Sequence, residues 1–446
     1  MIPLLLLLAT AGLMEAARSF TPLTGEYGTE LAFGFLLLAA YFMGQLVSKA
    51  GLPRLTGYLI AGVLAGPAVL ELVTHDMAGS LRVVNGVASC ILGLVAGSEL
   101  NLKKVRPLLP TLRGLMIFAV IGGIVLLGGV LFAIRPLIPL FDGMTFGQSV
   151  AVCGLLAVAL IPQSPAVVMA VLAETKADGP LSQTMLATVV VADLVVIVCY
   201  AIASAAAGAV IGGSVDVLST IGSVSWELLG SMAFGVVIGM LIGAFLRTVK
   251  EGASMFALLI CVVVAEVGGR VHLDPLVVML AAGIWLENFS RANSHDLLHS
   301  FESAQLPVFL VWFALAGLKL DLKQLWITLI PVLIIVVARG GAFYLGSKVA
   351  MSKDAPSPAV ANNAWIGLVP QAGLSLALIV LIQKTFPSFG GAAAVIMLSV
   401  LGVNQLVSPI LLRRALIKTG EAGKKSATDF APHTHGRRAA SLPGTH

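Results

Sequence analysis

Charged residues are scarce in this chain. They make up 11% of its 446 residues, against about 25% in an ordinary soluble domain. Hydrophobic residues make up 58%, and the mean hydropathy is +1.00. This composition excludes a water-soluble globular protein. Aromatic residues are also few, at 7%, and no apolar alternation occurs along the chain, which argues against an outer-membrane β-barrel.

Cysteine is equally rare, and the motifs of enzymes are missing. All four cysteines fall in apolar stretches, where we interpret them as small packing residues with no bearing on the redox compartment. The histidines lack metal-ligand spacing, no nucleophile and base occur in a recognisable arrangement, and no glycine-rich phosphate motif follows a strand. The sequence therefore predicts neither an enzyme nor a bound metal or cofactor.

Long apolar stretches with short connections fill most of the chain. We count thirteen predicted membrane spans after residue 28, each close to the ~20 residues that a helix needs to cross the hydrocarbon. The predicted fold is an all-α polytopic membrane protein. Residues 1–28 form a hydrophobic segment that is either a cleaved signal peptide or an extra N-terminal helix. Residues 417–446 are predicted to form a polar cytoplasmic tail.

The basic residues indicate an orientation in the membrane. If residues 30–48 run from outside to inside and the spans then alternate, most of the 27 Lys and Arg residues lie in the cytoplasm. This is the bias of the positive-inside rule. It accounts for the net charge of +5 without a nucleic-acid partner. We predict a bacterial inner membrane with a cytoplasmic C-terminus, and an organelle membrane stays open as an alternative.

An internal repeat is visible in two pairs of motifs. Residues 96–103 (AGSELNLK) resemble residues 316–323 (AGLKLDLK), and residues 53–62 have a looser echo in residues 275–283. We predict two six-helix repeats, 29–213 and 252–416, joined by one span at 227–246. Seven spans separate equivalent positions. Because seven is odd, the second repeat enters the membrane from the opposite face, which defines an inverted-topology repeat.

Two long spans are interrupted at matching places of the two repeats. Residues 161–165 read IPQSP and residues 369–373 read VPQAG. Proline frees a backbone carbonyl, and such a group is tolerated at membrane depth only when it is buried in protein or wet. We interpret the interruptions as a cation site to which Gln163, Ser164 and Gln371 add side-chain oxygens. A pair of proline kinks satisfied by neighbouring helices is the alternative.

Two charged residues lie alone in predicted spans. Asp193 is the sole charge of residues 181–213, and Arg339 is the sole charge of residues 325–347. A charge at a helix centre costs roughly 2.5–3.5 kcal/mol on translocon scales, so such residues face a partner or a wet cavity. We predict that Asp193 binds the transported ion and that Arg339 stabilises the site. A fixed ion pair between the two residues is the alternative.

A third candidate, Glu266, lies near the end of a predicted span. It precedes Arg270 by four residues, a spacing that suits an ion pair on one helix face. A position near the membrane surface equally suits a role in ion access. Both interpretations stay open at the level of sequence.

Several motifs together carry a family resemblance. They are residues 52–67 (LPRLTGYLIAGVLAGP), residues 313–322 (FALAGLKLDL), and residues 265–269 (AEVGG) followed by residues 281–283 (AAG). As a set, from about residue 30 to 415, the chain resembles the Kef- and Nap-type monovalent cation/proton antiporters of the cation/proton antiporter superfamily. The resemblance implies a core domain with two broken, crossing helices beside a dimerisation domain, in a homodimer within the lipid bilayer.

The same resemblance implies exchange of Na⁺, Li⁺ or K⁺ for H⁺, with proton and cation competing for Asp193. It also implies supporting roles for Gln163, Ser164, Arg339 and Gln371. Relatives commonly carry Asn, Asp or Gln before this aspartate, and here the residue is Ala192, so we expect electroneutral exchange.

Because residues 417–446 are a short polar segment, we expect this protein to lack the nucleotide-binding regulatory domain that many Kef-type proteins carry after the membrane domain. The alternatives are a ligand-gated Kef-like potassium efflux system and a transport-inactive membrane sensor on the same fold. The preferred cation stays open.

Overall fold

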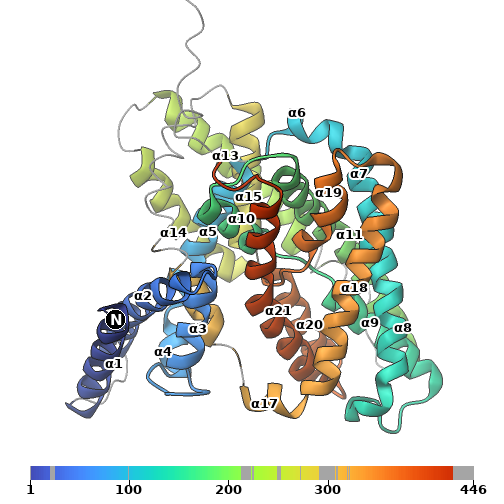
Figure 1. The fold of residues 1–446 in the computed structure, drawn as a ribbon, viewed down its shortest axis with the longest axis horizontal. Coiled ribbons are helices and arrows are strands. Elements are labelled where there is room, and N and C mark those ends of the chain that lie inside the picture. The colour runs from blue at the N-terminus through green and yellow to red at the C-terminus, as the bar shows by residue number, and fades with distance from the viewer. Residues whose placement is uncertain are drawn as a thin grey trace, which may run out of the picture.

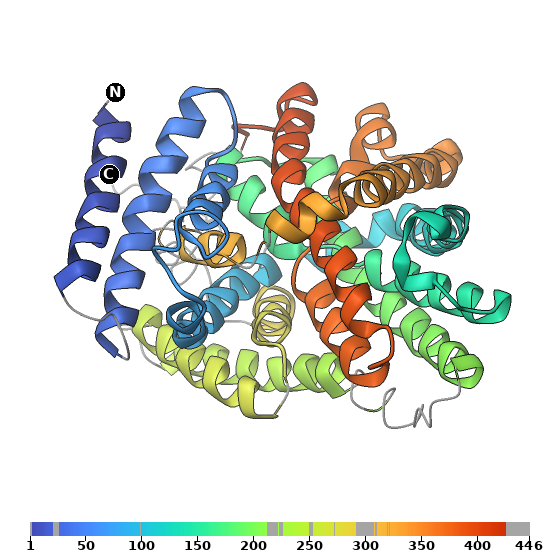
Figure 2. The same cartoon turned by 90° about the horizontal axis from the view of Figure 1, so that it is seen from below.

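The computed structural model describes residues 2–20, 26–98, 100–211, 222, 226–248, 253–271, 273–290, 307, 310–318, 320 and 322–424. These residues form helices and connections, without a strand among them. Figures 1 and 2 show α1 and α2 at one end of the molecule and α8 and α18 at the other.

The first half of the chain contains α1 (Ile2–Phe20), α2 (Glu26–Lys49), α3 (Arg54–Ala65), α4 (His75–Ser80), α5 (Arg82–Ser98), α6 (Leu102–Val105), η1 (Arg106–Leu108), α7 (Leu109–Gly114), η2 (Leu115–Ile121), α8 (Gly122–Ile134), η3 (Arg135–Leu137), η4 (Pro139–Phe141), α9 (Phe146–Leu160), α10 (Pro165–Thr175) and α11 (Pro180–Ile211). The second half contains η5 (Trp226–Gly230), α13 (Ser231–Thr248), α14 (Ala253–Val271), α15 (Pro275–Phe289), α17 (Leu322–Ile327), α18 (Leu329–Asp354), α19 (Pro358–Asn363), η6 (Ala364–Leu368), α20 (Gly373–Thr385) and α21 (Gly390–Lys418). Residues 310–318 are helical as well.

Within the described residues, eight helical stretches are long and apolar enough to cross a membrane. They are Gly28–Lys49, Arg106–Leu137, Phe146–Thr175, Pro180–Ile211, Ser231–Thr248, Leu329–Met351, Pro358–Thr385 and Gly390–Lys418. The prediction of an all-α polytopic membrane protein is confirmed, whereas the count of thirteen spans stays a prediction. An 18-residue window within the stretch Phe146–Thr175 is wholly buried by its neighbours, so this part of the stretch lies inside the bundle.

Both predicted interruptions are present in the structure. Helix α9 ends at Leu160 and α10 begins at Pro165, while η6 ends at Leu368 and α20 begins at Gly373. At the first break the Ser164 side chain accepts a hydrogen bond from the amide of Val167 at 3.3 Å, as an N-cap residue does. Proline at the first position of α10 suits this start, because its missing N–H has no helical partner there.

Glycines let α5 and α15 cross with their backbones in contact. A Cβ atom on Gly97 would lie 2.0 Å from the carbonyl oxygen of Leu280, and one on Gly283 would lie 2.3 Å from that of Leu94. Small residues at such crossings allow the close approach on which helix packing in membranes depends.

The same crossing recurs between α3 and the helical residues 310–318. A Cβ atom on Gly317 would lie 2.2 Å from the carbonyl oxygen of Leu59, and one on Gly62 would lie 2.0 Å from that of Ala314. These four residues are the ones that the predicted repeat makes equivalent to the four at the α5–α15 crossing. The matched geometry supports an internal repeat, and the opposite orientation of its halves stays a prediction.

The segment after α21 is packed against the start of α11. The Glu421 carboxylate accepts hydrogen bonds from the amides of Leu181 at 2.7 Å and Ser182 at 2.8 Å, and from the Ser182 hydroxyl at 2.7 Å. It satisfies amides that have no partner inside the helix and places a negative charge at its N-terminus. The predicted tail therefore begins with an ordered segment, and residues 425–446 lie outside the described residues.

We expect Glu421→Ala to lower the thermal unfolding midpoint of the detergent-solubilised protein by several degrees. Loss of the carboxylate leaves three hydrogen-bond donors near the start of α11 without an acceptor. An unsatisfied buried polar group costs about 1–3 kcal/mol. Lys424→Ala, at an exposed neighbouring position, is the matched control and should leave the midpoint unchanged. Equal midpoints for the two variants would contradict this role of Glu421.

Candidate functional site

One side chain connects the two interrupted helices. Arg339, in α18, is fully buried, and its hydrogen bonds within the described structure all go to backbone carbonyls of the two breaks. The acceptors are Leu160 at 2.7 Å, Pro162 at 3.1 Å and Ile161 at 3.3 Å from the first break, and Val369 at 2.6 Å and Leu368 at 3.2 Å from the second. The guanidinium also lies 4.6 Å from the centre of the Phe343 ring.

Gln371 and Asn404 extend this network. The Gln371 amide nitrogen donates to the carbonyl of Leu160 at 2.6 Å, and the Asn404 amide nitrogen donates to the Gln371 side-chain oxygen at 2.6 Å. Gln371 and Asn404 are both buried. Gln371 therefore joins the second break to the first and to α21, and its side-chain oxygen is already occupied.

This geometry differs from two sequence-level interpretations. The carbonyls expected to coordinate the cation accept from Arg339, and their residues are not among those that line the cavity described next. No ion pair joins Arg339 to Asp193, both of which the structure describes. Desolvation explains why Arg339 binds the carbonyls and not Asp193. The freed carbonyls are fixed at membrane depth and need a donor from the protein, whereas Asp193 has access to a cavity.

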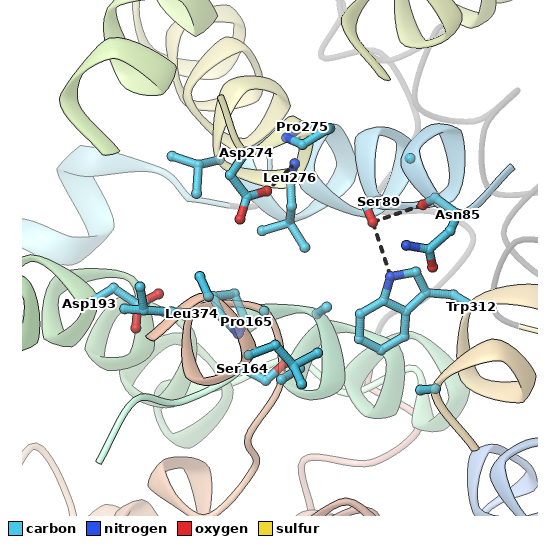
Figure 3. Close-up of a pocket in the computed structure, with 18 of the residues that line it drawn as sticks. Asn85, Ser89, Ser164, Pro165, Asp193, Asp274, Pro275, Leu276, Trp312 and Leu374 are labelled. Atoms are coloured by element: carbon cyan, nitrogen blue, oxygen red, sulfur yellow. Dashed lines mark hydrogen bonds between the residues drawn. The ribbon is translucent and has the colours of Figure 1, made fainter. Parts of the chain in front are cut away.

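A cavity of about 380 Å³ lies beside the first break, and Gln163 is among the residues that line it. Asp193 and Ser164 line it as well (Figure 3). The backbone amide of Gln163 donates to the Asp193 carboxylate, and the other carboxylate oxygen, Oδ1, has no hydrogen-bond partner in the structure. The Gln163 side chain is 1% exposed, and its nitrogen donates to the Ile161 carbonyl at 2.6 Å. Its oxygen has no partner among the described residues.

Asp274 lies on the opposite side of the cavity from Asp193 and Ser164 (Figure 3). It is the N-cap of α15, where its Oδ1 accepts from the amide of Leu276 at 2.8 Å. The Asp274 amide donates to the hydroxyl of Ser231 at 2.9 Å, which fixes the turn between α14 and α15 to the start of α13. Sequence analysis missed this residue, because Asp-Pro in a short connection indicates only the start of a helix.

Glu227 and Glu266 line the same cavity. Glu266 pairs with Arg270 at 2.6 Å on the surface of α14, so it is both part of an ion pair and a lining residue. Burial raises the pKa of Asp274, against the effect of the amides of Leu276 and Val277 that donate to it.

The cavity has a consistent electrostatic character. Four carboxylates line it, and its described lining contains no Lys, Arg or His. Gln405 of α21, which sequence analysis also missed, adds a buried side-chain oxygen without a hydrogen-bond partner in the described structure. Acceptor oxygens without matching donors are what a desolvated cation requires of its ligands.

Buried charges at paired helix breaks beside an acidic cavity, within an all-helical membrane bundle, define a membrane ion transporter. Residues 34–413 match the family of sodium/hydrogen exchanger transmembrane domains. The chain belongs to this family and is a member of the cation/proton antiporter superfamily, which confirms the resemblance found in the sequence. The family consists of transporters rather than enzymes. No curated protein matches the chain.

The fold is similar to that of solved structures of the sodium/proton antiporter MjNhaP1 from Methanocaldococcus jannaschii. The structure at pH 8 has a TM-score of 0.62 at 13% identity and covers 87% of this chain and 98% of the other. The electron-microscopy map of the same antiporter gives a TM-score of 0.69 at 14% identity, with coverages of 89% and 98%. At this identity the likeness establishes the fold.

We expect Arg339→Lys to lower both the thermal unfolding midpoint and any transport activity. A lysine ammonium carries the charge but lacks the planar, five-donor geometry that reaches both breaks. Each stranded carbonyl costs about 1–3 kcal/mol. Arg113→Lys, at an exposed position of α7, should change neither property. An Arg339→Lys protein with the wild-type midpoint would show that Arg339 does not hold the breaks together.

Proposed function

We propose that this protein exchanges a monovalent cation, Na⁺, Li⁺ or K⁺, for a proton by alternating access, with Asp193 as the group for which the two compete. The observation that carries the proposal is the Oδ1 of Asp193, which has no hydrogen-bond partner among the described residues and lies at a cavity whose described lining contains acids and no base. Membership of the sodium/hydrogen exchanger family supports the same class of substrate.

Charge at the site favours a cation over an anionic substrate. An organic anion entering this cavity meets four carboxylates and no compensating side chain in the described lining. Arg339, which is buried at the helix breaks, has its donors directed to backbone carbonyls. Like charges in a poorly solvated space repel strongly, so the cavity disfavours anions.

The cycle has two loaded states. In one, Asp193 is protonated and therefore neutral. In the other it is ionised and binds the cation together with the side-chain oxygens of Ser164 and Gln163. An ionised carboxylate without a cation is costly within the membrane, so the empty site does not change sides. The flux of the cation is therefore coupled to the flux of the proton.

One proton replaces one monovalent cation on one carboxylate, which makes the exchange electroneutral. Ala192, which precedes Asp193 and is fully buried, adds no second titratable group at this point of α11. Arg339 remains bound to the helix breaks in both states and is not transported.

The remaining predictions on architecture complete the proposal. In the topology favoured by the basic residues, the turn that bears Asp274 lies on the outer side, so the cavity opens outward. The two halves form an inverted repeat, and the protein is a homodimer in a bacterial inner membrane with its C-terminus in the cytoplasm. Gln371 and Glu266 stabilise the site, Gln371 through the breaks and Glu266 through its pair with Arg270.

We expect Asp193→Asn to abolish exchange while leaving the fold intact, because asparagine keeps the shape and the acceptor but cannot hold a cation against a proton. The measurement is dequenching of a pH-sensitive dye in proteoliposomes with an acid interior, after addition of Na⁺, Li⁺ or K⁺ in turn. Asp142→Asn removes an exposed carboxylate away from the cavity and should exchange like wild type.

Retained exchange in a folded Asp193→Asn protein would remove Asp193 from the mechanism. A folded wild-type protein that responds to no cation would instead contradict the antiporter, and would favour the gated efflux system or the sensor.

A further inference from the structure

A second carboxylate faces the same cavity from a different group of helices. Asp193 belongs to α11, beside the breaks that Arg339 connects, whereas Asp274 is the N-cap of α15, which packs against α5 and α13. Figure 3 shows the two acids on opposite sides of the pocket, with open space between them. Each therefore contributes a negative charge to the cavity from its own wall.

The two oxygens of Asp274 have different surroundings. Oδ1 accepts from the amide of Leu276 and caps α15. Oδ2 points toward the second break, since a Cβ atom on Gly373 would lie 3.9 Å from it. Gly373 is the first residue of α20, so Asp274 faces the breaks across the cavity while it caps its own helix.

Besides its acids, the cavity has neutral side-chain oxygens that could contact a cation. Gln163 and Gln405 are 1% and 3% exposed, line the cavity, and each has a side-chain oxygen without a hydrogen-bond partner among the described residues. Within the described part of the chain, no three acidic, His or Cys side chains gather closely enough to hold a metal ion. Asp193 and Asp274 lie on opposite sides of the cavity (Figure 3), so a cation can contact each of them in turn.

We infer that Asp274 is a second cation-binding residue, a fixed first contact that holds the incoming monovalent cation before Asp193 takes it. This inference rests on the proposed exchange at Asp193 and adds to it the route by which the cation arrives. The electrostatic interaction between Asp274 and Asp193 supports the transfer, because a cation between them is attracted by both.

The role is compatible with electroneutral exchange. Ser231 and the N-cap bond hold Asp274 to α13 and α15, so it stays with that wall while the site at the breaks changes access. Its charge raises the local concentration of cations at the cavity without crossing the membrane. The stoichiometry of the exchange is then set by the ion bound to Asp193 alone.

The test separates charge from helix capping. Asparagine caps helices as well as aspartate does, so Asp274→Asn removes the charge and keeps the cap. We expect the cation concentration for half-maximal exchange to rise about three- to tenfold, the effect of one nearby unit charge in a wet protein site. The rise should occur in only one of two membrane preparations, right-side-out or everted vesicles, because Asp274 contacts cations from one side.

Asp193→Asn should abolish exchange in both vesicle orientations, and Asp142→Asn should leave both unchanged. An unchanged half-maximal concentration in Asp274→Asn would reduce Asp274 to a helix cap. An equal rise in both orientations would indicate general damage to the fold and would equally overturn the inference.

A binding measurement decides the inference if wild-type vesicles do not exchange and the proposed function fails. The thermal midpoint of the detergent-solubilised protein is titrated with NaCl, LiCl and KCl, with choline chloride as the control for ionic strength. We expect the cation concentration for half-maximal stabilisation to be about three- to tenfold higher in Asp274→Asn than in wild type. Equal titrations, or no stabilisation of the wild-type protein by any of the three cations, would overturn it.

Discussion

The structure depends on how the backbone of two interrupted helices is satisfied at membrane depth. Carbonyls freed at the breaks have no water to accept from, and leaving them unpaired costs free energy. Arg339 donates to both breaks at once, which fixes each relative to the other. Arginine suits this position because its five donors lie in one plane and its charge persists under desolvation. Because Arg339 donates to carbonyls, it does not pair with Asp193, and the Asp193 carboxylate is available to bind an ion.

Much of this site was predictable from residues that stand out against an apolar background. Asp193 and Arg339 were found because each is alone in a long uncharged stretch, and the breaks because proline removes a helical donor. The partner of Arg339 was not predictable, since charge alone does not distinguish a carboxylate from a group of carbonyls. The distinction depends on which groups the fold places beside Arg339, and these come from segments about 30 and 179 residues away.

Asp274 and Glu421 were missed for a different reason. Asp274 lies in a short connection and Glu421 in the predicted polar tail, and in both places an acid is ordinary and its spacing carries no signal. Their roles depend on residues that are far away in sequence: Glu421 binds the start of α11, 240 residues earlier. The motifs that carry the family resemblance likewise report packing. Their glycines Gly62, Gly283 and Gly317 lie at contacts between helices. Resemblance in such motifs reports the packing and leaves the details of ion selectivity to other residues.

The glycine crossings also impose an order on biosynthesis. Helix α3 packs on residues 310–318 and α5 on α15, so helices of the first half are completed by helices made later. Arg339 follows Leu160 by 179 residues, which corresponds to roughly 9–36 s at synthesis rates of 5–20 residues per second. During that interval the first break has neither Arg339 nor Gln371. The nascent first half must therefore keep those carbonyls hydrated or held by the insertion machinery until the second half arrives.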